Sequence, residues 1–182
     1  MISMLSSLIF LTAAATATVE LPTDGIMTAP NVDCISKAVS PAESRNFFAM
    51  ARSGKEEDAF SLAEKVASRC QKTHGWSAAT TRAAFRVAIM NGWLLEEGLL
   101  DRIAERGDFR PFLDSYYVEN VKPDGRHILE DVFLSGKMDR DLTAQGYPED
   151  TESRELAYNY WEWRGALYDI EEEFRKAAPA KP

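Results

Sequence analysis

The stretch from residue 151 to residue 177 constrains the fold most, because its large apolar side chains recur at alternating spacings of four and three residues. This spacing places them in one stripe along an α-helix. A stripe of that length has to be covered by another helix. The sequence therefore predicts a long C-terminal helix whose buried seam consists of Leu156, Tyr160, Trp163, Leu167, Ile170 and Phe174.

Helix-start and helix-stop signals divide the first half of the chain. Ser40 and Glu43, with a proline directly after the serine, form a capping box that predicts a helix ending near residues 53–54. A second helix is acidic at its start and is terminated by Gly75, the polarity that the helix dipole favours. Its apolar positions at spacings of three and four predict a core stripe of Ala59, Leu62, Ala63, Val66, Ala67 and Cys70.

The segment after Ser77 predicts the central helix of the fold. Ser77 is a capping residue, and residues 83–90 are apolar on most sides. Asn91 and Gly92 follow, and we expect them to break or kink the helix before a helical continuation to Gly107.

Three further segments have predicted structures. Pro30 is expected at the first position of a short helix. Residues 109–133 repeat at helical spacing on both sides of a Pro-Asp-Gly turn and predict a helical hairpin, although such a turn also joins β-strands. Residues 135–150 are polar and are expected to form a loop. The predicted fold class is all-α, a small irregular helical bundle of five to seven helices with one disulfide.

The N-terminus reads as an export signal. Residues 1–17 contain no charged side chain, and an apolar run is followed by small residues, as in a secretory signal peptide. We expect cleavage after Ala17, or alternatively after Ala15, and delivery to the periplasm or the medium. An uncleaved anchor is the alternative, but the apolar run is shorter than the roughly 20 residues that span a bilayer. Residues 18–29 would be an extended lead-in, 30–178 a single α-helical domain and 179–182 a frayed tail.

Cys34 and Cys70 are the two cysteines of the chain. In an oxidising compartment an even cysteine count favours a disulfide, which would fasten the N-terminal segment to the helix that carries Cys70. Two free buried thiols and a nucleophilic cysteine are the alternatives. A nucleophile would need a nearby base, and neither histidine stands in a recognisable context for one.

The charge balance restricts the class of partner. The chain has 21 Lys and Arg against 29 Asp and Glu, a formal net charge of −8. An acidic surface repels phosphate backbones, so nucleic acid is not an expected partner. We also expect no stable membrane insertion of the mature chain, and a basic protein or envelope component would be attracted.

Motifs for catalysis are weak. The two histidines form no metal-ligating pair, and glycine-rich phosphate loops are absent, so the sequence predicts no metal and no cofactor. His127 and Asp131 are four residues apart on a predicted helix, where a carboxylate could orient an imidazole for proton transfer. A surface ion pair is the simpler interpretation. No catalytic residue is predicted, and the sequence favours binding over enzymatic activity.

A second face of the C-terminal helix is the remaining candidate site. Trp161 and Tyr168 are seven residues apart and share this face, next to Glu171 and Glu172. The face either widens the core or forms an aromatic binding patch, which the glutamates would bias toward a cationic partner.

These observations predict an exported acidic α-helical binding protein of unknown ligand that shields or inhibits a basic envelope or secreted partner. One alternative is an envelope hydrolase that uses His127 or an unidentified acid/base pair. The other is a structural or assembly protein that uses the aromatic seam of residues 156–174 between chains.

Overall fold

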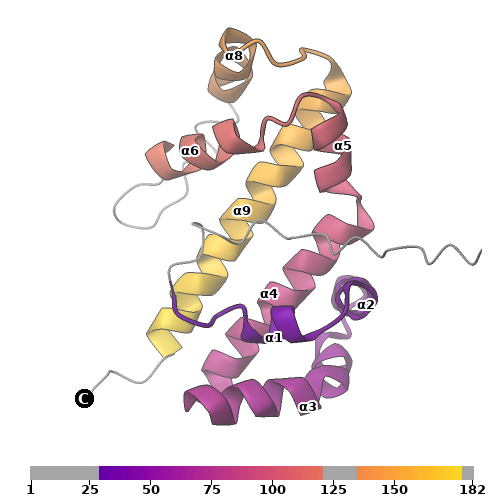
Figure 1. Ribbon diagram of the computed structural model, residues 1–182, viewed down its shortest axis with the longest axis vertical. Coiled ribbons are helices and arrows are strands. Elements are labelled where there is room, and N and C mark those ends of the chain that lie inside the picture. Colours follow the sequence, from indigo (N-terminus) through magenta and orange to yellow (C-terminus); the bar gives the residue numbers. More distant parts are fainter. Residues whose placement is uncertain (1–28, 121–134, 178–182) are drawn as a thin grey trace, which may run out of the picture.

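The computed structural model describes residues 29–120 and 135–177. Within these ranges the chain forms eight helices and no strand, so the all-α prediction is confirmed and the helix count exceeds the predicted range by one. Figure 1 shows their arrangement. The helices are α1 (Cys34–Ala38), α2 (Pro41–Arg52), α3 (Glu56–His74), α4 (Ala78–Glu96), α5 (Leu99–Glu105), α6 (Arg110–Asn120), α8 (Lys137–Ala144) and α9 (Thr151–Ala177).

Helices α4 and α9 form the antiparallel centre of the fold (Figure 1). The Thr80 hydroxyl at the start of α4 donates to the carbonyl oxygen of Ala177 at the end of α9, over 2.8 Å. Farther along, the indole nitrogen of Trp163 donates to the carbonyl oxygen of Met90, over 3.1 Å. All six residues of the predicted seam are buried. The partner that the seam required is therefore α4 of the same chain.

Helix α2 packs so closely on α4 that only glycine fits at position 92. A Cβ atom on Gly92 would lie 2.0 Å from the carbonyl oxygen of Ser44. The predicted break at Asn91 and Gly92 is therefore wrong, because Gly92 serves this helix contact and α4 continues to Glu96. The chain instead turns at Gly98, whose φ of +57° is left-handed.

The disulfide prediction is confirmed. Cys34 is bonded to Cys70, with 6.1 Å between their Cα atoms, and this bond joins α1 to α3. The first helix starts at Cys34 and not at Pro30 as predicted, because Asn31 takes a left-handed φ of +65° that interrupts helical geometry.

The capping predictions for α2, α3 and α4 are confirmed. Ser40 and Glu43 form both hydrogen bonds of the capping box, Ser77 accepts from the backbone N–H of Thr80, and Gly75 ends α3 in the left-handed conformation. The predicted core stripe of α3 needs one correction. Leu62 is 63% exposed, because the buried stripe follows Ala59, Ala63, Ala67 and Cys70 and Leu62 lies outside it.

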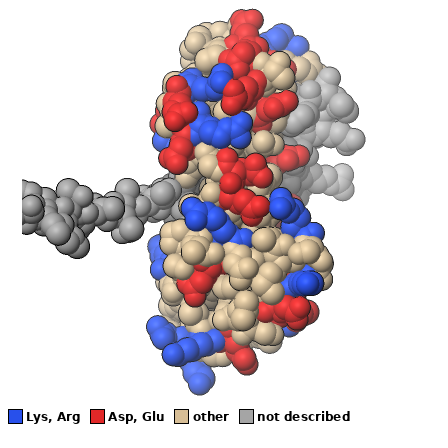
Figure 2. Space-filling view, turned by 90° about the vertical axis from the view of Figure 1, so that its right-hand side faces the viewer, with Lys and Arg blue, Asp and Glu red and all other residues tan. Residues whose placement is uncertain are grey.

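Helices α5, α6 and α8 lie at the other end of α9 (Figure 1). The predicted loop 135–150 is wrong in its first part, because Met138 and Leu142 are four residues apart and both buried, which anchors α8. Helix α6 supports the helical interpretation of the first half of residues 109–133, and the second half lies outside the described residues. Turned by 90°, the molecule shows charged side chains of both signs gathered over its upper part (Figure 2).

Several predictions fall outside the described ranges. They are the signal peptide, most of the lead-in, the tail, and His127 with Asp131. No helix of the described ranges is long and apolar enough to cross a bilayer.

Candidate functional site

The predicted aromatic patch is not a surface. Trp161 is 2% exposed, and its ring lies 5.3 and 5.2 Å from the rings of Tyr116 and Tyr117 on α6. Tyr168 is half-buried and its ring lies 6.3 Å from Tyr117. This second face of α9 therefore widens the core, which was the other interpretation of the sequence.

The glutamates of that patch hold the chain together instead of facing a partner. Glu171 is 2% exposed and accepts a hydrogen bond from the backbone N–H of Ala29 over 2.6 Å. Glu172 is half-buried, and both glutamates form ion pairs with Arg175. All four residues of the predicted patch therefore make contacts within the chain.

A buried polar cluster links α6 to α9 on the same side. The guanidinium of Arg164 is 2% exposed, and its Nε lies 2.9 Å from Oδ1 of Asp114. The same carboxylate oxygen accepts a hydrogen bond from the hydroxyl of Tyr160 over 2.9 Å. Burial lowers the pKa of Arg164 and raises the pKa of Tyr160. A paired charge at such depth fixes how two helices meet, and we assign this cluster a structural role.

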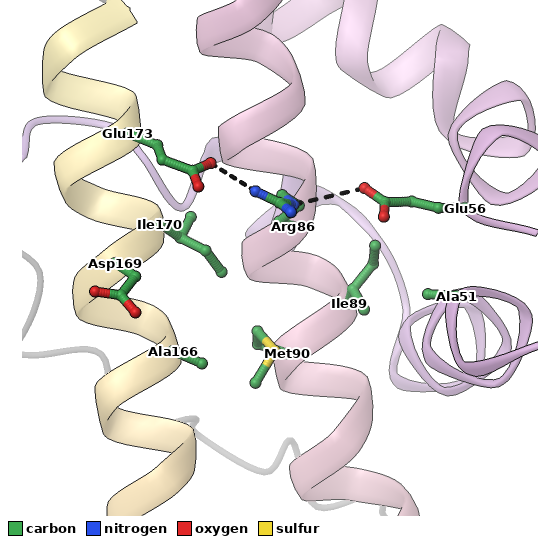
Figure 3. A pocket seen from close by; sticks show the side chains of 9 residues that line it. All are labelled: Ala51, Glu56, Arg86, Ile89, Met90, Ala166, Asp169, Ile170 and Glu173. Atoms are coloured by element: carbon green, nitrogen blue, oxygen red, sulfur yellow. Dashed lines mark hydrogen bonds and ion pairs between the residues drawn. The ribbon is translucent and has the colours of Figure 1, made fainter. Parts of the chain in front are cut away.

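The opposite side of α9 carries a pocket of about 310 Å³ between α4 and α9, which we call the α4–α9 pocket. In Figure 3, Met90 from α4 and Ala166 and Ile170 from α9 point toward one another between the two helices. Ile89 and Ile170 are 7% and 6% exposed, so this floor is continuous with the core. Its lining residues are Ala51, Glu56, Arg86, Ile89, Met90, Ala166, Asp169, Ile170 and Glu173.

Charged side chains surround the apolar floor. Arg86 donates to Oε2 of Glu173 over 2.6 Å, and its Nε lies 3.6 Å from Oε1 of Glu56 (Figure 3). These side chains are 42% to 56% exposed. Half-exposed pairs of this kind contribute about 0–1 kcal/mol to stability. The rim can therefore rearrange around a ligand at little cost to the fold.

The pocket has a net negative formal charge. Glu56, Asp169 and Glu173 bring three carboxylates against the one guanidinium of Arg86. The carboxylates come from the start of α3 and the end of α9, so tertiary packing brings together residues far apart in the chain. The rim attracts positively charged groups, and the floor accepts aliphatic ones.

Regular helix spacing builds this site, although it was not among the sites predicted from the sequence. On α9, Ala166, Asp169, Ile170 and Glu173 fall at steps of three, one and three residues, which places them on one face. That pattern is readable from the sequence as a mixed acidic and apolar face. Its importance comes from its position opposite Arg86 and Met90 of α4, which only the antiparallel pairing reveals.

The side chains that line the pocket are carboxylates, one guanidinium and apolar groups. Its lining residues include no histidine, cysteine, serine or threonine. Across the described ranges, no group of three or more His, Cys, Asp or Glu side chains is arranged to hold a metal ion. Comparison with protein-family models, with curated proteins and with solved structures found no match to this chain. The function of the pocket therefore has to be inferred from its carboxylates and its apolar floor.

Proposed function

We propose that this protein is an exported, acidic α-helical binding protein that shields or inhibits a basic envelope or secreted partner, and that the α4–α9 pocket is part of its contact surface. The observation that carries the proposal is the pocket itself, in which an apolar floor lies beneath a rim of net negative charge. The formal net charge of −8 means that the molecule as a whole also attracts positively charged partners.

The Cys34–Cys70 disulfide supports the compartment in this proposal. Disulfides persist in oxidising environments such as the periplasm or the extracellular medium. We place the protein there after removal of residues 1–17, with cleavage after Ala17 or Ala15.

The two alternatives have less support. The seam of residues 156–174 is buried against helices of its own chain, which argues against its use for assembly with a second chain. The envelope hydrolase remains a prediction, because His127 lies outside the described residues and no observation selects an acid/base pair among the carboxylates.

The experiment that tests the proposal starts with affinity capture from the exporting cell's envelope fraction at low and at high ionic strength. The captured protein is then purified, and its association rate with the wild-type chain is measured across salt concentrations. For electrostatically steered association we expect a fall of about tenfold or more from low to high salt.

A matched pair of variants links this association to the pocket. Glu173→Gln removes a rim charge, whereas Glu155→Gln removes the same charge from an exposed position about 27 Å away along α9. We expect weaker binding of the partner with Glu173→Gln and little change with Glu155→Gln. A partner that is not basic, or binding that does not depend on salt, would overturn the proposed function.

A further inference from the structure

The volume of the α4–α9 pocket restricts what part of a partner it can hold. Small-molecule sites usually enclose about 300–1,000 Å³, and 310 Å³ is at the lower end of this range. The space suits one long side chain and not a folded element. The partner therefore presents a single residue to the floor.

The chain's own Arg86 shows how the rim binds a positive charge. Its guanidinium already occupies Oε2 of Glu173 and lies near Oε1 of Glu56. A second guanidinium would bind best through both oxygens of one carboxylate, and at Glu173 one of them is taken. An ammonium group is a compact point charge that needs one oxygen at a time, so it fits beside Arg86 without displacing it.

The floor matches the remainder of such a side chain. Ile170, Met90 and Ala166 form an apolar surface below the carboxylates (Figure 3). A lysine can lay its four-carbon stem on apolar surface while its charged end stays at the wetter rim. The thioether of Met90 is adaptable and fills irregular gaps beside such a stem.

We infer that the α4–α9 pocket binds a lysine side chain of the basic partner, with the ammonium at Glu173 and the aliphatic stem on Ile170, Met90 and Ala166. This inference rests on the proposed function. It adds the identity of the recognised group, a primary amine at the end of an unbranched stem. Arginine and a purely apolar side chain are the competing occupants.

A series of short peptides tests this inference. Each is a glycine-flanked peptide with both termini blocked, whose central residue is lysine, ornithine, diaminobutyrate, norleucine or arginine, so that the central side chain carries the only charge. They are titrated into the oxidised protein labelled with ¹³C at the methionine methyl groups, and the Met90 signal is assigned with Met90→Leu. Titration to about 10 mM gives near-complete occupancy even for a dissociation constant near 1 mM.

The expected result is graded. Ornithine and diaminobutyrate keep the charge but remove one and two methylene groups, so affinity should fall about fourfold per methylene if the stem is buried. Norleucine keeps an apolar stem without the charge and should bind more weakly than lysine, as should arginine. Glu173→Gln should weaken lysine binding, whereas Glu155→Gln should not.

Contrary results separate this inference from the proposed function. Equal affinity along the stem series, or arginine binding at least as tightly as lysine, would overturn the lysine assignment. So would an unmoved Met90 signal with the lysine peptide. The proposed function would survive any of these results if the captured basic partner still bound with salt dependence and sensitivity to Glu173→Gln. The proposed function would be overturned as well only if this salt-dependent binding of the captured basic partner were also absent.

Discussion

Two regions of the molecule are held together by different means. The first region, α1 to α4, has ion pairs and ring contacts such as Arg82–Glu57 and Phe47–Phe85. It has in addition the Cys34–Cys70 bond and the close backbone approach of α2 to Gly92. In the second region, α5, α6 and α8, aromatic rings and ion pairs make the contacts without a disulfide, because both cysteines of the chain lie in the first region. Arg106 pairs with Asp150 and Glu152, and Lys137 pairs with Asp141 and lies over the ring of Tyr116.

The two regions should therefore resist different conditions. A disulfide and a backbone contact do not depend on salt or on mild changes of pH, whereas half-exposed ion pairs are screened by salt. We therefore expect the second region to open at a lower free energy than the first in native-state hydrogen exchange. The α4–α9 pocket is lined by α2, α3 and α4 of the first region on one side and by α9 on the other, so one of its walls belongs to the more rigid region.

Removal of the disulfide should give the largest effect. The double variant Cys34→Ser/Cys70→Ser releases a loop with a sequence separation of 36 residues, which the loop-entropy model values at about 4 kcal/mol. Urea unfolding of the oxidised protein and the variant measures the loss, and reduced wild type is the control. Amides of α1 and α3 should lose protection while those of α5 keep it. A loss spread equally over both regions would contradict the comparison.

Gly92→Ala should give the next largest effect, a loss of about 3 kcal/mol, because its Cβ would overlap the Ser44 carbonyl. In an uncrowded helix the same change stabilises by about 1 kcal/mol, so the sign of the measured change reports on the contact. Gly98→Ala is a suitable control. Nothing lies within 4 Å of its Cβ, and only its left-handed φ opposes alanine, at about 1–2 kcal/mol. If Gly92→Ala left the stability in thermal unfolding unchanged, α2 would not approach α4 this closely.

The buried pair of the second region predicts an asymmetry. Asp114→Asn leaves the guanidinium of Arg164 buried without its carboxylate and should cost about 2 kcal/mol, less than for a fully buried pair because Asp114 is 34% exposed. Arg164→Met removes the buried charge and fills similar space, so it should cost less than Asp114→Asn. Chemical denaturation of both variants gives the order. The reverse order would mean that Arg164 contributes mainly through its own packing.

The smallest effect should come from Arg106→Ala, which removes the half-exposed pairs with Asp150 and Glu152 and should cost at most about 1 kcal/mol. The cost should shrink in high salt, unlike that of the disulfide variant. If the cost of Arg106→Ala does not shrink in high salt, Arg106 stabilises the fold by packing. The two regions would then differ less in their response to salt.

Acid should also act on the second region. Asp150, directly before α9, accepts hydrogen bonds from the backbone N–H and hydroxyl of Ser153, which lower its pKa. The stabilisation is complete above the unfolded-state value of about 3.9 and is lost as pH falls through the lower folded-state pKa. Asp150→Asn should therefore reduce the fall in the free energy of unfolding at acidic pH. Urea unfolding of the variant and the wild type at a series of pH values measures this change.

Local signals were read correctly where the responsible atoms are close in sequence. Ser40 and Ser77 start helices through hydrogen bonds three residues away, and Gly75 ends one through its own φ. Errors arose where a distant segment decides the outcome. Gly92 resembles a helix break until α2 is placed on it, and Trp161 resembles a binding residue until α6 covers it.

By itself the sequence determined the helical class, most helix ends, the long buried seam of α9 and the bonded cysteine pair. Periodicity, capping and cysteine count are short-range or compositional properties, so they need no knowledge of packing. Tertiary structure alone decided which face of α9 is buried by α6 and which borders a pocket with α4. Each face of a helix carries a definite pattern, but its exposure depends on the helix packed against it, and that pairing is not encoded in local spacing.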